Sequence, residues 1–220
     1  MNTDNTLVLL DTCVLMPPRL SDVLMDLRAQ RLFSLHWSGE IEAEYVRNMQ
    51  AVLGFEKTAV LRRLAAMKRC CPEWQVPVAQ RDMSAVPASV DAKDRHVAAA
   101  ALALRRYADE EGDPEAACSV FLVTFNTADM AVRPMGTKGV KVLRPGAFLD
   151  LVYDMHPEPS ALAVQQAARD LKHPPYTLAE LLGALHGHGA KGLVKRLAAL
   201  WGLVPVRVGS SAADARGEES

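Results

Sequence analysis

The pattern of hydrophobic and polar positions changes period repeatedly over the first 154 residues, which predicts alternating strands and helices. Short, continuous apolar runs predict buried strands at 6–10 (TLVLL), 33–37, 120–124 (VFLVT) and 140–143. Apolar residues at helical spacing predict helices at 21–30, with Ser21 as N-cap after Pro17 and Pro18, and at 38–53, 56–70, 92–111 and 146–153. The proline-containing segment 72–87 is predicted to be a loop with a short edge strand at 75–78.

Strands that alternate with helices predict a parallel sheet covered by helices on both faces, an α/β fold with three layers. Ligands of such sheets bind outside the carboxyl ends of the strands. Asp11 directly follows the first predicted strand, and Asn126 and Asp129 lie just beyond the strand at 120–124. This edge of the sheet is therefore the first place to expect a functional site.

The pattern changes after His156, where the chain becomes wholly helical. Residues 160–171 and 177–200 have helical spacing, and Thr177 with Glu180 forms a predicted capping box. We therefore divide the chain into a sheet-containing domain at 1–155, a C-terminal α-helical module at 156–208 and a small, polar, disordered tail at 209–220.

Charge excludes a protein that coats nucleic acid with a uniformly basic surface. Lys and Arg number 25 against 26 Asp and Glu, for a formal net charge of -1, so any contact with nucleic acid must be local. The helical module has a local positive excess that includes Lys191, Lys195 and Arg196. We take these three as the candidate RNA-binding residues, with an ordinary solvated helix face as the alternative.

Cysteine usage and hydropathy point to the cytoplasm. Cys13, Cys70, Cys71 and Cys118 have no paired spacing typical of a zinc site, and we expect them to be reduced structural thiols. The apolar run at 7–10 is too short and lacks the basic flank of a signal peptide, and no stretch approaches the roughly 20 apolar residues of a membrane span.

Four acidic residues are candidates for one metal site: Asp11, Glu44, Asp94 and Asp129. Each also has a plainer interpretation. Asp11 and Asp129 occupy positions typical of turn or first-turn residues, and Glu44 shares an acidic helix face with Glu40. Asp91 is best explained as the N-cap of the helix that follows, which leaves Asp94 in its first turn.

A set of carboxylates suits Mg²⁺, which prefers oxygen ligands and assists phosphodiester hydrolysis. None of the six histidines has the spacing of a zinc hydrolase motif. His96 lies two residues from Asp94, on what helical geometry predicts to be a different face. The sequence thus favours an acid-only site without a histidine base.

Four segments in order resemble the PIN-domain family, and within it the VapC-like toxins. They are LLDTCVL ending at Leu15, the Ser38-x-x-Ile41-x-x-Glu44 pattern, DAKDRHVAAA from Asp91, and LVTFNTADM ending at Met130. The resemblance covers roughly residues 6–154. It implies a PIN-like three-layer α/β/α fold, to which the C-terminal helical module is an addition.

The resemblance also implies a function. Asp11, Glu44, Asp94 and Asp129 become catalytic metal ligands for Mg²⁺, or for Mn²⁺, supported through hydrogen bonds by Thr124 and Asn126. The implied activity is that of a toxin endoribonuclease that cleaves RNA such as tRNA. The implied protein partner is a cognate antitoxin, and a homodimer is compatible with the family.

Two alternatives remain open. One is a housekeeping PIN nuclease of RNA processing, and the other is a non-catalytic PIN-fold module that binds RNA or protein. A dehalogenase-like phosphotransfer protein also begins with a strand and an Asp. That family has Asp or Thr two positions after its first Asp. It is excluded here because Asp11 is followed by Thr12 and then Cys13.

Overall fold

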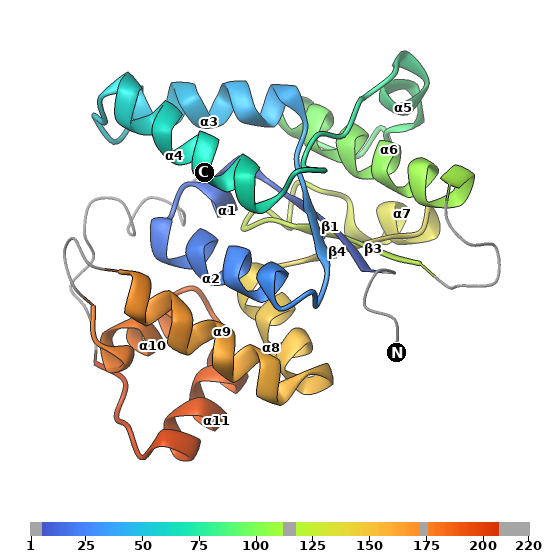
Figure 1. Ribbon diagram of the computed structural model, residues 1–220. Coiled ribbons are helices and arrows are strands. Elements are labelled where there is room, and N and C mark those ends of the chain that lie inside the picture. The colour runs from blue at the N-terminus through green and yellow to red at the C-terminus, as the bar shows by residue number, and fades with distance from the viewer. Residues whose placement is uncertain (1–5, 112–117, 172–175, 207–220) are drawn as a thin grey trace.

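The computed structural model has an α/β fold built on four parallel strands, and it describes residues 6–111, 118–171 and 176–206 (Figure 1). The strand order is β2-β1-β3-β4, with β1 and β3 in the centre. Their bounds are β1 (Thr6–Leu10), β2 (Ser34–His36), β3 (Ser119–Val123) and β4 (Val140–Leu143). The predicted parallel sheet is confirmed, and each of the four expected strands is present within one or two residues.

The helices connect these strands and then continue into the C-terminal part. Their bounds are α1 (Thr12–Leu15), α2 (Pro18–Ala29), α3 (Gly39–Ala51), α4 (Lys57–Cys70), α5 (Gln80–Ala85), the 3₁₀ helix η2 (Ala92–Asp94), α6 (Arg95–Glu111), α7 (Val132–Thr137), α8 (Pro145–Met155), α9 (Pro157–Asp170), α10 (Leu178–Gly187) and α11 (Lys191–Trp201). No described helix combines the length and apolar composition that a membrane span requires.

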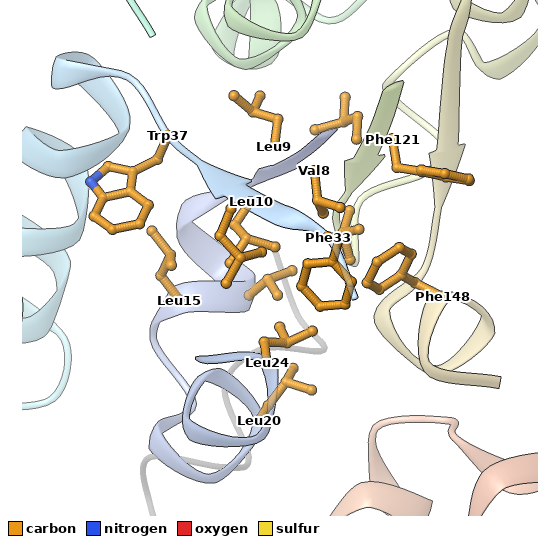
Figure 2. Close-up of a cluster of buried hydrophobic side chains, with 14 of the residues drawn as sticks. Val8, Leu9, Leu10, Leu15, Leu20, Leu24, Phe33, Trp37, Phe121 and Phe148 are labelled. Atoms are coloured by element: carbon orange, nitrogen blue, oxygen red, sulfur yellow. The ribbon is translucent and has the colours of Figure 1, made fainter. Parts of the chain in front are cut away.

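Side chains alternate across the sheet and bury both of its faces. Helix α6 packs against β1, β3 and β4 on one face. On the opposite face, the ring of Phe148 on α8 packs 5.2 Å from that of Phe33 and 5.6 Å from that of Phe121. Figure 2 shows Leu9 on one side of β1 and Leu10 on the other, toward α2. The arrangement is therefore a three-layer α/β/α fold.

The C-terminal helices pack onto the sheet domain as part of one core. Helices α9 and α10 lie along α2, and α11 packs on α8 (Figure 1). Buried Leu181 and Val194 belong to the same hydrophobic cluster as the sheet residues. Helices α9 and α10 thereby cover one side of α2.

Several helix boundaries differ from the sequence prediction near prolines and short turns. Helix α2 begins at Pro18 rather than after Ser21, because proline is well suited to a first helical position, and the Ser21 hydroxyl donates to the Pro17 carbonyl oxygen at 3.1 Å. The four-residue helix α1 before it was not predicted. Helix α5 occupies part of the expected loop at 72–87, where the short edge strand is reduced to one bridge between Trp37 and Gln75.

The predicted helical segment at 177–200 is present as two helices, because a turn separates α10 from α11. Gly189 has φ +88°, which a continuous helix does not permit. The Thr177–Glu180 capping box is confirmed at the start of α10. The predicted end of the long helix at residue 111 is confirmed in α6, and the expected disordered tail at 209–220 lies outside the described residues.

Candidate metal and catalytic site

Asp11 is the most enclosed of the four candidate acids, because it joins β1 to α1 at the carboxyl edge of the sheet. Its side chain is only 6% exposed. Its backbone N–H donates to the Val123 carbonyl oxygen at 3.1 Å, and its Oδ2 accepts a 2.6 Å hydrogen bond from Thr124 Oγ1. Burial raises the pKa of Asp11, the Thr124 and Cys13 hydrogen bonds oppose this increase, and Glu44 adds to it.

Cys13 takes part in this arrangement, which the sequence interpretation as an ordinary structural thiol did not foresee. Its Sγ donates to Asp11 Oδ2 at 3.1 Å and accepts from the Phe125 backbone N–H at 3.4 Å. Burial raises the pKa of the Cys13 thiol well above its usual value, and the neighbouring Asp11 charge raises it further. The thiol therefore stays protonated and acts as a hydrogen-bond donor to the carboxylate.

Glu44 approaches the same region from α3. Ser38 caps this helix by accepting a hydrogen bond from the Ile41 backbone N–H at 3.3 Å, as predicted. Glu44 Oε2 accepts from Thr12 Oγ1 at 2.8 Å and lies 3.1 Å from His96 Nε2. Glu40, one turn earlier, is exposed. Of the two glutamates on this face, Glu44 is the one that the fold turns inward.

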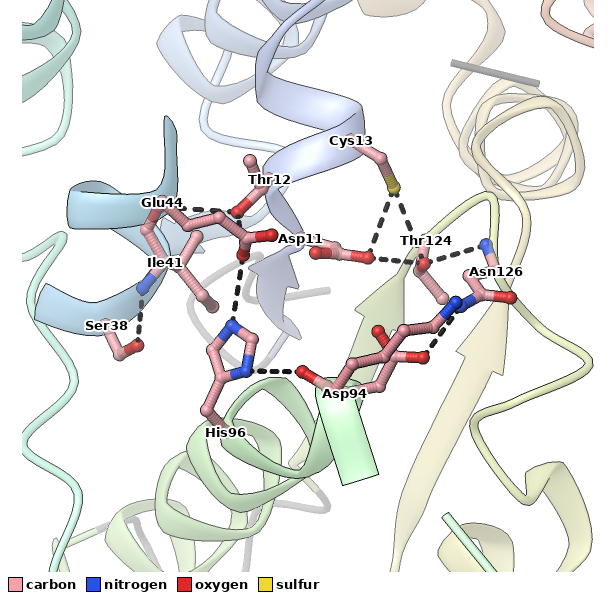
Figure 3. Close-up of polar contacts among 11 residues, drawn as sticks. Asp11, Thr12, Cys13, Ser38, Ile41, Glu44, Asp94, His96, Thr124 and Asn126 are labelled. Atoms are coloured by element: carbon pink, nitrogen blue, oxygen red, sulfur yellow. Dashed lines mark hydrogen bonds and ion pairs between the residues drawn. The ribbon is translucent and has the colours of Figure 1, made fainter. Parts of the chain in front are cut away.

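His96 also contacts this cluster, which the expectation of a site made of acids alone did not include. Figure 3 shows its imidazole reaching Glu44, beside Asp11 and Asp94. His96 contacts Glu44, whereas Asp94 contacts Asn126, which agrees with the different helix faces expected for the two side chains. The Glu44 contact raises the pKa of His96 and lowers that of Glu44.

Asp94 and Asp91 have the separate roles that their spacing predicts. Asp91 Oδ1 accepts from the Lys93 backbone N–H at 3.0 Å and caps the 3₁₀ turn. Asp94 Oδ2 instead accepts from Asn126 Nδ2 at 2.7 Å. Burial raises the pKa of Asp94 to about 6, and the Asp11 charge contributes to the increase. Asp94 therefore faces the other acids across the strand ends.

Asp129 lies at the rim of the cluster. Its carbonyl oxygen accepts from the Asp91 backbone N–H at 3.1 Å, which ties the third motif to the fourth. Its carboxylate lies 3.5 Å from Lys93 Nζ. The Asp129 charge contributes to the raised pKa of Asp94. The fold thus gathers all four candidate acids into one electrostatically interacting cluster.

The donor chemistry of this cluster fits a hard divalent cation. Asp11 and Asp94 are enclosed carboxylates whose pKa values are raised, and a bound cation would favour their ionised forms. Among the described residues, no three His, Cys, Asp or Glu side chains are arranged to hold one ion together. Mg²⁺ commonly uses one or two carboxylates and keeps several waters, so it does not need such a group.

The three candidate RNA-binding residues differ in their surroundings. Arg196 forms an ion pair with Asp154, and its guanidinium carbon lies 4.5 Å from the centroid of the Tyr153 ring. Lys191 and Lys195 are exposed, and no ion pair joins either of them to another described residue. Lys191 borders a pocket that also contains Phe125, whereas Lys195 does not.

Comparison with known proteins adds one relationship. A family model described as the VapC50 C-terminal domain matches residues 145–199, from the first residue of α8 into α11. This match indicates a relationship to the VapC family of toxins. No curated protein and no solved structure matches the chain. The expected PIN motifs lie N-terminal to the matched region, apart from the helices that follow them.

Proposed function

We propose that this chain is a Mg²⁺-dependent endoribonuclease and the toxin of a type II toxin–antitoxin pair. The observation that carries the proposal is the meeting of Asp11, Glu44, Asp94 and Asp129 at one carboxyl edge of the sheet. The match to the VapC50 C-terminal domain supports the toxin assignment. Mn²⁺ is the expected substitute for Mg²⁺.

Asp11 and Asp94 are the residues that we expect to hold the metal ion. Thr124 and Asn126 donate to them at 2.6 and 2.7 Å, and these bonds fix the directions of the two carboxylates. Thr12 does the same for Glu44. Lys93 reaches Asp129 from the exposed rim and partly compensates its charge. Together these contacts prepare the acids to receive a cation and the RNA phosphate that accompanies it.

A bound Mg²⁺ ion would supply an activated water and would stabilise the charge that develops on the phosphate. The chain itself supplies position and protonation. Glu44 is held in its ionised form by His96 and Thr12, and it faces the same space as Asp11. We propose that Glu44 accepts a hydrogen bond from the attacking water and orients it toward the phosphorus.

As a toxin, the protein would have an antitoxin as its partner and RNA as its substrate. We further propose that it forms a homodimer and that it lies in the cytoplasm. The carboxylate cluster is the surface that an antitoxin must block. A basic side chain of the antitoxin placed among Asp11, Asp94 and Asp129 would neutralise the charges that otherwise hold the metal ion.

Controlled expression in a bacterial host tests the proposal. Wild type should arrest growth and leave discrete new RNA ends, which sequencing of those ends would map. Asp11→Asn, at equal protein level, should do neither. Growth arrest by both forms, or arrest without new RNA ends, would reject the endoribonuclease. Mg²⁺-dependent cleavage in vitro without growth arrest would retain the nuclease and reject the toxin.

A further inference from the structure

A second feature lies at the same edge of the sheet, next to the Thr124–Asn126 segment. It is a pocket of about 410 Å³, within the size range of sites that bind small molecules. The residues that line it include Phe125, Arg144, Ala147, His186, His188 and Lys191. We call it the Phe125 pocket.

The Phe125 pocket is joined directly to the acidic cluster by the chain. Phe125 stands between Thr124, which donates to Asp11, and Asn126, which donates to Asp94. Its own backbone N–H donates to Cys13 Sγ. A single peptide segment therefore presents polar groups to the acids and an aromatic ring to the pocket. An RNA strand bound at the acidic cluster therefore needs to extend only a short way to enter the pocket.

The lining of the pocket is basic. Arg144 and Lys191 are exposed, and neither has an ion pair with another described residue. None of the lining residues is acidic. Helix α8 begins at Pro145, so its next N–H groups, those of Gly146 and Ala147, have no acceptor within the helix. The pocket thus combines two cationic side chains with a helix amino end, which favours anions.

The amino end of the neighbouring helix α11 is already occupied. Asp150 accepts hydrogen bonds from the Gly192 and Leu193 backbone N–H groups, at 3.0 and 2.7 Å. This carboxylate caps α11. The anion-binding capacity that remains in the pocket comes from α8, Arg144 and Lys191.

His188 provides an independent sign of a ligand. Its side chain is 8% exposed and lines the pocket, yet its Nε2 has no hydrogen-bond partner among the described residues. Its ring lies 5.6 Å from that of Phe125, at an angle of 49°. A buried polar atom without a partner destabilises the fold unless something else satisfies it. Because this atom is enclosed, a ligand with a hydrogen-bonding group near its phosphate would do so once the imidazole turns toward the pocket.

We propose that the Phe125 pocket binds one nucleotide of the RNA substrate next to the cleaved bond, an inference that rests on the proposed nuclease function. Arg144, Lys191 and the amino end of α8 receive its phosphate, and His188 Nε2 hydrogen-bonds to the same nucleotide. RNA is favoured over a free small anion because the pocket adjoins the acidic cluster and carries an aromatic ring. Carboxylates repel phosphate, so substrate binding beside them needs a cationic subsite of this kind.

Fluorescence anisotropy with a labelled single-stranded RNA, in EDTA to prevent cleavage, tests the phosphate contacts. The double variant Arg144→Ala/Lys191→Ala should bind about tenfold more weakly, and the slope of log K against log salt should become shallower by about 0.7 for each phosphate that the variant no longer neutralises. Lys138→Ala/Lys141→Ala is the matched control, because it also removes two exposed positive charges, near the start of β4 at the opposite edge of the sheet. A folded double variant that matches wild type in affinity and slope would overturn the proposal.

Nuclear magnetic resonance of the His188 imidazole tests the pocket in the unaltered protein. Titration with adenosine monophosphate should shift the His188 ring resonances, and the shift should be absent in Arg144→Ala/Lys191→Ala. If the His188 resonances do not move at saturating nucleotide, the proposed nucleotide site is overturned, even if the protein cleaves RNA. A clear shift in a protein that cleaves no RNA would instead retain the pocket and reject the nuclease.

Discussion

Thr124 Oγ1 donates a 2.6 Å hydrogen bond to Asp11 Oδ2 and so connects the ends of the two central strands, β3 and β1. The same hydroxyl oxygen accepts from the Asn126 backbone N–H at 2.9 Å. One side chain therefore orients the most enclosed carboxylate and also shapes the turn that carries Asn126 toward Asp94. Much of the geometry of the proposed site depends on this hydroxyl.

Replacing Thr124 should weaken the site without abolishing the fold. Thr124→Val has nearly the same shape but loses both hydrogen bonds, so the Mg²⁺ concentration for half-maximal cleavage should rise about 10–100-fold. Thr124→Ser keeps the hydroxyl and should stay near wild type. Equal Mg²⁺ dependence in the Val and Ser variants would show that this hydroxyl does not support the metal ligand.

Glu44 and Glu40 form a matched pair for testing which glutamate serves the site. Glu44→Gln loses the charge that faces Thr12 and His96, and its cleavage rate should fall about 10–100-fold. Glu40→Gln removes a carboxylate charge one turn earlier on the same helix, at an exposed position. It should leave the cleavage rate within about twofold of the wild-type rate. Single-turnover cleavage of a labelled RNA measures both. A larger loss in Glu40→Gln than in Glu44→Gln would reverse the assignment.

Asp26, on α2, gives the fold a predictable pH dependence outside the site. Burial raises its pKa from 3.8 to about 7, and the neighbouring Asp170 and Asp22 charges contribute. The folded state therefore holds this proton more tightly than the unfolded state, so stability increases as the pH falls from about 7 toward 4. Asp26→Asn removes the penalty and should stabilise the protein by about 1 kcal/mol at pH 8, after allowance for solvent screening.

Thermal unfolding between pH 4 and pH 8 measures this effect. The stabilisation by Asp26→Asn should shrink as the pH falls and vanish near pH 4. Asp22→Asn is the contrasting variant, because Asp22 Oδ1 accepts a 2.9 Å hydrogen bond from Arg63 and loses an ion pair when it is neutralised. Stabilisation by Asp26→Asn that is constant over the whole pH range would contradict the electrostatic explanation.

Close backbone contact attaches the C-terminal helices to the sheet domain. A Cβ atom added at Gly146 would lie 2.1 Å from the Gly189 carbonyl carbon, so Gly146→Ala forces α8 away from the turn between α10 and α11. We expect a loss of about 1–3 kcal/mol or more. Gly136→Ala has open space around it and should be neutral or stabilising. Chemical denaturation of both variants checks this, and equal stabilities would contradict the close packing.

The sequence was most informative where a pattern has one physical meaning. The apolar runs before Asp11 and at 140–143 predicted strands, and Ser38 predicted a helix start, because these signals depend on local chemistry. The sequence was least informative where tertiary contact decides. Nothing in the local sequence brings Cys13 to the Phe125 backbone N–H, which lies 112 residues away along the chain. The turn at Gly189 likewise lies against Gly146, far from it in sequence.

His96 illustrates the same limit within the site. Its distance from Glu44 along the chain is 52 residues, and only the packing of α3 on α6 brings the two together. The acids themselves were easier to predict, since Asp11 follows a strand and parallel strands bring their carboxyl ends to one edge.

Metal-dependent cleavage of RNA by the purified protein is the decisive measurement for a metal site built on these acids. We predict that wild type cleaves a labelled RNA with Mg²⁺ or Mn²⁺, that EDTA stops the reaction, and that restored Mg²⁺ returns it. Asp11→Asn and Asp94→Asn should remain folded and inactive at every Mg²⁺ concentration. Cleavage that persists in EDTA, or that survives both substitutions, would contradict a metal site built on these acids.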